Sequence, residues 1–280
     1  MTAAVRVPPR GGVRVYRPTT VEARECAVRR VIAVMRERYA ESLSLEQLSN
    51  IAISSPFHFN RVFREVTGLP PLRFLSAVRL QVAKHLLLTT RRSVTNICFG
   101  VGYSSLGTFT THFAEYVGAP PTQFRRLSAI ARIADLLPTP IPEPDVVLPE
   151  TGCVRGRVRA PSRDAGEGAA IVGLFTSRLP RGQPRACAVA PIGGTFSLDG
   201  VAPGSYHLFS VVVNTFANGF DLFLGESMRV GHVGPIIVRD AGELAPIDVE
   251  LRWPRDTDPP LLVALPVLMA KRMALQRASG

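Results

Sequence analysis

The feature that most constrains the fold is an internal repeat at an offset of 50 residues in the first half of the chain. The segment FREVTGLPPLRF, which starts at Phe63, aligns with FAEYVGAPPTQF, which starts at Phe113. Upstream of these segments, Ser55 returns as Ser105. Self-similarity at a fixed period indicates that one supersecondary unit is used twice.

Helix-capping residues divide the first copy into a short helix, a turn and a longer helix. Ser44 precedes LEQLSNIA with Gln47 three positions later, which is a capping box. Ser55 caps the second helix, Pro56 occupies its first turn, and Gly68 ends it. This order is that of a helix-turn-helix unit.

The second copy repeats this order. Ser93 starts its first helix, Gly100 and Gly102 make the turn, Ser105 caps the second helix and Gly118 ends it.

A single apolar-periodic helix over residues 72–90 is predicted between the two units. Its length is about 27 Å at 1.5 Å per residue. Major-groove faces on one side of a duplex repeat about every 34 Å, so such a rod suits two recognition helices in successive grooves.

The positive charge is concentrated in the same half. The net charge is +11, and residues 19–128 contain 14 Lys or Arg against 7 Asp or Glu, whereas residues 150–255 contain 11 against 10. This distribution is typical of a protein that binds a polyanion. The alternative is a compositional bias toward arginine, since 31 of the 33 basic residues are Arg.

Residues 22–128 resemble the DNA-binding domain of the AraC/XylS family of bacterial transcription regulators. The resemblance is carried by SLEQLSNIAISSPFHFNRVFREVTGLPPLRFLSAVRLQVAKHLL and by ICFGVGYSSLGTFTTHFAEYVGAPPTQFRR. It implies a seven-helix domain with two reading units that binds promoter DNA and usually activates transcription by contacting RNA polymerase.

The long helices of the two units present different candidate reading faces. Opposite the apolar side, the first offers a guanidinium for guanine, an amide for adenine and an aromatic ring for a thymine methyl, while the second offers small uncharged groups. The alternative for the first face is a solvated helix surface. With the resemblance, the candidate base contacts are Phe57, Asn60, Arg61, Arg64, Leu106, Gly107, Thr110 and Thr111.

Relatives often carry arginine where this chain has Thr111, so the second helix is expected to position the protein more than to read bases. Candidate phosphate contacts are Arg79, Arg125 and Arg126, with ordinary surface charge as the alternative.

The pattern changes after a proline-rich segment. Beyond it, short runs alternate with a period of two and are separated by Gly and Pro turns, which predicts strands. The expected organisation is multidomain, an all-α double helix-turn-helix domain followed by an all-β antiparallel sandwich. Its parts are a disordered basic arm 1–18, the helical domain 19–130, a linker 131–150, the sandwich 151–255 and a partly helical tail 256–280.

The segments GCVRGRV, GAAIVGL and GGTFSLDGVAPGSYHLFSVVV resemble the carboxypeptidase regulatory-like, transthyretin-like sandwich. That resemblance implies a binding or assembly module with an unknown small-molecule or protein partner.

The sequence allows more than one role for several residues of this half. The face that carries Arg155, Arg157 and Arg159 is either a solvated sheet face that resists edge aggregation or a contact for an anion or the DNA backbone. The two histidines and the tryptophan are interpreted as isolated structural residues: His207, His232 and Trp253. The tail packs on either domain or on a second subunit.

Composition and motifs limit the function classes. There is no run of roughly 18 apolar residues, no signal-peptide pattern and no CxxC pair among the four cysteines. No catalytic motif, metal site or cofactor site is found, so a cytoplasmic, non-enzymatic protein is expected. The hypotheses are a sequence-specific promoter-binding regulator, a nonspecific DNA-binding or assembly protein, and a repair enzyme, which the lack of clustered cysteines disfavours.

Overall fold

The computed structural model describes residues 20–130, 152–160, 168–182, 184–214, 228–239 and 245–263. The predicted basic arm, the proline-rich linker and the tail beyond residue 263 lie outside the described residues.

The described N-terminal half contains the seven predicted helices. They are α1 Thr20–Glu37, α2 Leu45–Ile51, α3 Pro56–Thr67, α4 Pro71–Thr89, α5 Val94–Gly100, α6 Leu106–Val117 and α7 Pro121–Ile130.

The predicted capping residues are confirmed. The Ser44 side chain accepts from the backbone N–H of Gln47 at 3.2 Å, and the Gln47 side chain accepts from that of Ser44 at 2.8 Å. Gly68 and Gly118 end α3 and α6 with φ of 81° and 98°, a left-handed conformation that favours glycine.

The repeat exists because each unit builds the same aromatic core. Equivalent phenylalanines are buried in both units, and neighbouring ring centroids lie 5.4 to 5.7 Å apart in tilted or edge-on contact. These residues are Phe59, Phe63 and Phe74 in the first unit and Phe109, Phe113 and Phe124 in the second.

The described C-terminal half is rich in β-strands. They are β1 Gly152–Arg159, β2 Gly168–Phe175, β3 Ala186–Pro191, β4 Thr195–Val201, β5 Gly204–Asn214, β6 Val230–Val238 and β7 Ile247–Glu250. They form two sheets with strand orders β4-β1-β7 and β3-β2-β5-β6, and apolar side chains from both share one core.

Pairing is antiparallel throughout the named strands except for β1 with β7, which is parallel. The expectation of an all-antiparallel β half was therefore wrong at this pair. The sequence pattern of a four-residue strand contains no signal for its direction.

The arginine face of β1 lies in the centre of its sheet. Arg155, Arg157 and Arg159 are exposed, but β1 lies between β4 and β7, so resistance to edge pairing does not explain them. Arg159 pairs with Asp248 of β7 at 2.6 Å. Charges of both signs therefore occupy this face, as expected for a solvated surface.

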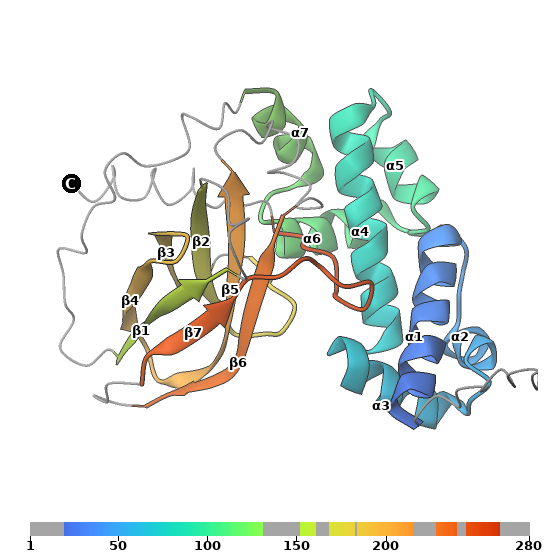
Figure 1. The fold of residues 1–280 in the computed structure, drawn as a ribbon. Helices are drawn as coiled ribbons and strands as arrows, with labels where there is room; N and C mark the ends of the chain where they lie inside the picture. Colours follow the sequence, from blue (N-terminus) through green and yellow to red (C-terminus); the bar gives the residue numbers. More distant parts are fainter. Residues whose placement is uncertain are drawn as a thin grey trace, which may run out of the picture.

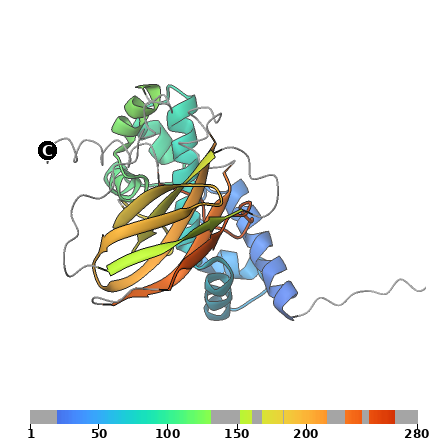
Figure 2. The same cartoon turned by 60° about the vertical axis from the view of Figure 1, so that its left-hand side comes forward.

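The two halves pack against each other (Figures 1 and 2). The segment after β7 runs between the four-stranded sheet and α4. There Leu262 is buried in the helical core, and the buried Lys84 donates to the carbonyl oxygen of Leu261 at 2.9 Å. Arg36 of α1 also pairs with Asp256 at 3.2 Å. The described start of the predicted tail thus packs on the helical half.

This packing gives a prediction for a fragment of residues 19–130. The proline-rich linker predicts that the fragment folds and binds DNA alone. Because it loses Leu262 from its core, we expect its melting temperature to lie about 4 °C or more below that of the helical half in the full chain, a shift that corresponds to roughly 1 kcal/mol. Calorimetry of the two proteins measures the difference, and equal melting temperatures would contradict the contribution of the β half.

Candidate nucleic-acid interface

The predicted reading face of α3 is exposed to solvent. Phe57 is 83% exposed, and Asn60, Arg61 and Arg64 are exposed, while Phe59 on the opposite side is buried. An aromatic ring this exposed beside two guanidinium groups has the composition of a base-reading surface.

Local contacts hold the central arginine of this face. Arg61 donates to Glu65 at 2.9 Å, and its other terminal nitrogen lies 3.3 Å from Nδ1 of His58. Exposed ion pairs of this kind contribute little to stability, so the guanidinium remains available for an anionic or base partner.

The corresponding face of α6 is accessible but carries no charge. Leu106 is 39% exposed, Gly107 and Thr111 are exposed, and Thr110 is half-buried. These groups offer methyl contacts and single hydrogen bonds, so the structure preserves the difference between the two faces that the sequence predicts.

Two of the three candidate phosphate contacts have structural partners. Arg79 donates to the carbonyl oxygens of Tyr39 and Glu41, both at 2.8 Å. Arg125 donates to the carbonyl oxygens of Leu87 at 3.1 Å and of Arg92 at 2.7 Å. These bonds hold the loops before α2 and α5.

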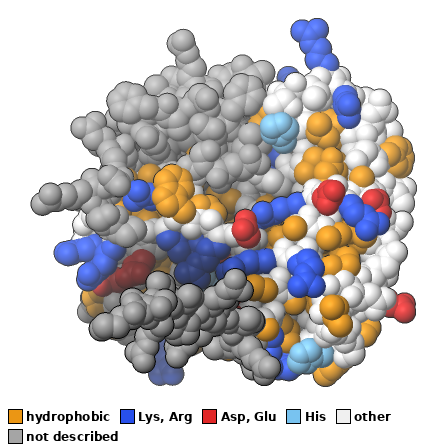
Figure 3. Space-filling view, turned by 45° about the vertical axis from the view of Figure 1, so that its right-hand side comes forward, with side chains coloured by type: hydrophobic (Ala, Val, Ile, Leu, Met, Phe, Trp, Pro, Cys, Tyr) orange, Lys and Arg blue, Asp and Glu red, His pale blue; other side chains and the backbone are white. Residues whose placement is uncertain are grey.

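Arg126 keeps its predicted place on the surface. Its side chain is exposed on α7. Lys and Arg side chains lie across the middle of the face drawn in Figure 3, with Asp and Glu side chains among them.

The turn between α2 and α3 contains a residue with an unusual backbone conformation. Ile53 has a positive φ of 52° and is 85% exposed. Counted from the end of the preceding helix, α2 or α5, the residue of the second unit that corresponds to Ile53 is Gly102, with φ of 88°. Ile53 donates to Asn50 and Gly102 to Phe99 at the same three-residue separation. A β-branched residue in this conformation is strained.

Replacing Ile53 with glycine is expected to raise the free energy of unfolding by about 1 kcal/mol, because the left-handed strain exceeds the entropy that glycine adds to the unfolded chain. Thermal melting measures the change. The matched control is Gly102→Ala, which should destabilise, since its Cβ would lie 2.7 Å from the carbonyl oxygen of Ala40. An unchanged or lower melting temperature for Ile53→Gly would show that Ile53 is unstrained.

The interpretation of the β-half histidines as isolated was wrong. Nδ1 of His207 lies 3.1 Å from Nε2 of His232, and their rings stack with centroids 5.3 Å apart. An irregularity in the pairing of β5 with β6 brings the two side chains together, and periodicity does not reveal it. Trp253 is also in contact, with the Arg229 guanidinium 5.2 Å from its ring centroid.

This pair predicts a pH-dependent stability. The pKa of His232 is lowered to about 4, mainly by burial and secondly by the charge of Arg178. Burial also lowers the pKa of His207. Arg252 also disfavours the charged form of His232, whereas Asp258 favours it. The unfolded chain binds protons near the ordinary histidine pKa of about 6.5, so the stability present above that pH is lost as the pH falls toward 4.

We therefore expect the melting temperature to fall between pH 7.5 and pH 5. His232→Phe should flatten this dependence, while His58→Gln, a change at an exposed histidine, should not. A wild-type melting temperature that is constant over this range would contradict the assignment.

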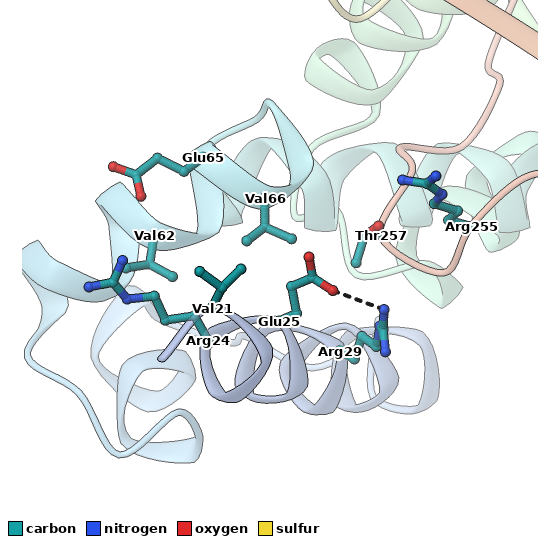
Figure 4. A pocket seen from close by; sticks show the side chains of 9 residues that line it. All are labelled: Val21, Arg24, Glu25, Arg29, Val62, Glu65, Val66, Arg255 and Thr257. Carbon is teal, nitrogen blue, oxygen red and sulfur yellow. Dashed lines mark hydrogen bonds and ion pairs between the residues drawn. The ribbon is translucent and has the colours of Figure 1, made fainter. Parts of the chain in front are cut away.

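A groove of about 540 Å³ lies between α1, α3 and the segment after β7 (Figure 4). Val21, Val62 and Val66 face its interior. Around them, arginines alternate with glutamates, and Glu25 pairs with Arg29 at 3.1 Å. Because both signs of charge line it, the groove lacks the character of an anion site.

Metal-binding and membrane-spanning features are absent from the described part of the chain. No cluster of three or more His, Cys, Asp or Glu side chains is placed to hold a metal ion there. No helix among the described residues has the length and apolar character needed to cross a membrane.

Comparisons with known proteins match the helical half. A family described as helix-turn-helix domain matches residues 48–127. The Bacillus subtilis bifunctional transcriptional activator/DNA repair enzyme AdaA is 32% identical over 92 residues, which is 33% of this chain and 44% of that protein. XylDLEGF operon transcriptional activator 2 of Pseudomonas putida is 30% identical over 111 residues, 39% of this chain and 70% of that protein.

Among solved structures, the DNA-binding domain of the global transcriptional factor AdpA in complex with a target DNA is 31% identical. The match covers 37% of this chain and 94% of that one, with a TM-score of 0.36. The chain spans less than half the length of the first curated relatives that it matches.

Proposed function

Because the chain belongs to the AraC/XylS family of helix-turn-helix transcription regulators, we propose that it is a cytoplasmic, sequence-specific DNA-binding activator of transcription. The observation that carries this proposal is the pair of exposed faces on equivalent helices of the two units, α3 and α6, joined by the continuous helix α4.

The two faces have different roles in this proposal. Asn60, Arg61 and Arg64 read base edges in the major groove with help from Phe57, since their side chains are exposed and can form the required bonds. Leu106, Gly107, Thr110 and Thr111 of α6 contact methyl groups and position the protein.

Arg126 contributes a phosphate contact, since its guanidinium is exposed and a guanidinium can bind phosphate in a bidentate manner. RNA polymerase is the proposed protein partner, in keeping with the family.

The β half is proposed to be a carboxypeptidase regulatory-like sandwich that binds a small molecule or a protein. Two packed sheets support this assignment. So does the hydroxyl of Tyr206, which donates to the carbonyl oxygen of Ala202 at 2.8 Å and ties the start of β5 to the preceding turn.

Genome-wide mapping of bound DNA tests the proposal. Discrete peaks that share a sequence motif are expected, and loss of those peaks in an Arg61→Ala strain would connect them to the α3 face. Diffuse coverage would instead favour the alternative, a nonspecific DNA-binding or assembly protein.

The repair activity in the name of AdaA belongs to that protein. In this chain the four cysteines lie on separate elements: Cys26, Cys98, Cys153 and Cys187.

A further inference from the structure

The two reading units differ at one repeat position, and the β half supplies the missing group. In α3, Arg61 pairs with Glu65 at 2.9 Å. In α6, Glu115 corresponds to Glu65, but Thr111 corresponds to Arg61. Glu115 pairs instead with Arg181, from the loop between β2 and β3, at 2.7 Å. Both units thus carry a glutamate–arginine pair, but the arginine of the second unit comes from the other domain.

The loop that carries Arg181 is anchored to the helical half. Its Leu179 is 5% exposed and belongs to the helical core. The backbone N–H of Gly182 donates to the carbonyl oxygen of Glu115 at 2.7 Å, which satisfies a group in the last turn of α6. The Arg178 side chain packs against Gly68 at the end of α3. These contacts fix the Arg181 backbone relative to both recognition helices.

The environment of Arg181 suits an anion. Its guanidinium lies 5.8 Å from the ring centroid of Tyr116, whose hydroxyl accepts from Arg73 at 3.1 Å. Two guanidinium groups therefore flank one tyrosine, and Glu115 is the acidic group paired with Arg181 there. The Arg181 side chain remains 41% exposed, close to the 50% of Arg61.

We propose that Arg181 binds a DNA phosphate beside the major groove that α6 faces, so that the β half completes the DNA-binding surface of the second unit. This inference rests on the proposed function. Glu115 is one turn beyond Thr111 on α6, which places Arg181 at the C-terminal end of the reading face and at its flank. A guanidinium at that place meets the backbone of a duplex and not its base edges.

The salt dependence of DNA affinity in the full chain tests this inference, because its slope counts the phosphates that the protein neutralises. Arg181→Gln is expected to lower affinity about tenfold, as for a lost charge-assisted hydrogen bond. The slope of log affinity against log salt should decrease by about 0.9. Arg157→Gln, which removes the same charge from an exposed strand face, is expected to change neither quantity.

Glu115→Gln separates a DNA contact from a purely structural ion pair. It breaks the same pair but keeps the guanidinium, so the slope should stay unchanged. The proposal would be overturned if Glu115→Gln and Arg181→Gln lost equal affinity and equal melting temperature while the salt slope of both variants stayed unchanged. Arg181 would then have a structural role only.

The variants Arg61→Ala and Arg181→Gln together separate a failure of this inference from a failure of the proposed function. If Arg61→Ala weakens binding while Arg181→Gln does not, the inference fails alone; if neither variant changes binding, the proposed function fails as well.

Discussion

We expect the affinity for a preferred duplex to fall by about three to five decades between 50 and 200 mM salt if the chain neutralises about six to ten phosphates. Each neutralised phosphate releases condensed counterions, and added salt opposes that release. The helical segment 19–128 has a net charge of +7, and Arg61, Arg64 and Arg126 are exposed on it.

Titration of one labelled duplex at four salt concentrations measures this dependence. Thermal melts under the same conditions control for unfolding. Affinity that is insensitive to salt would contradict the interpretation of the charged helical half as a polyanion-binding surface.

The helical half was predictable because its signals are local. A capping box is read from Ser44 and Gln47, and a left-handed helix end is read from Gly68, because these bonds join residues within one turn. The spacing of Phe59 and Phe63 likewise identifies the buried side of α3 and therefore its opposite, exposed face.

Contacts between distant segments were not predictable in this way. Arg181 and Glu115 are separated by 66 residues, and Lys84 and Leu261 by 177. No periodicity connects such positions, so the packing of the β half on the helices appears only in the structure.

The backbone partners of the candidate phosphate-binding arginines could not be predicted for the same reason. The carbonyl oxygens that bind Arg79 come from the loop before α2, on another part of the chain. An arginine that donates to backbone carbonyl oxygens and an arginine that is available to bind DNA look the same in the sequence.

The largest effect of a single substitution on sequence preference is expected at Arg61. It is exposed on α3 and can form bidentate bonds with guanine, whereas Thr111 at the equivalent place on α6 offers one neutral hydrogen bond. Arg61→Ala should cost about 1 to 3 kcal/mol on the preferred site and relax the choice at one base pair. Thr111→Ala, the matched variant, should cost less than about 1 kcal/mol.

Selection from a randomised duplex library at fixed salt measures both quantities for each variant. Loss of preference at a single position in Arg61→Ala, with the motif of Thr111→Ala unchanged, would establish α3 as the main reader. If Arg61→Ala instead lowers affinity evenly across all sequences while Thr111→Ala scrambles the motif, then Arg61 contacts phosphate and α6 reads the bases. That result would reverse the roles of the two faces, because an even loss is what removal of a sequence-independent backbone contact produces.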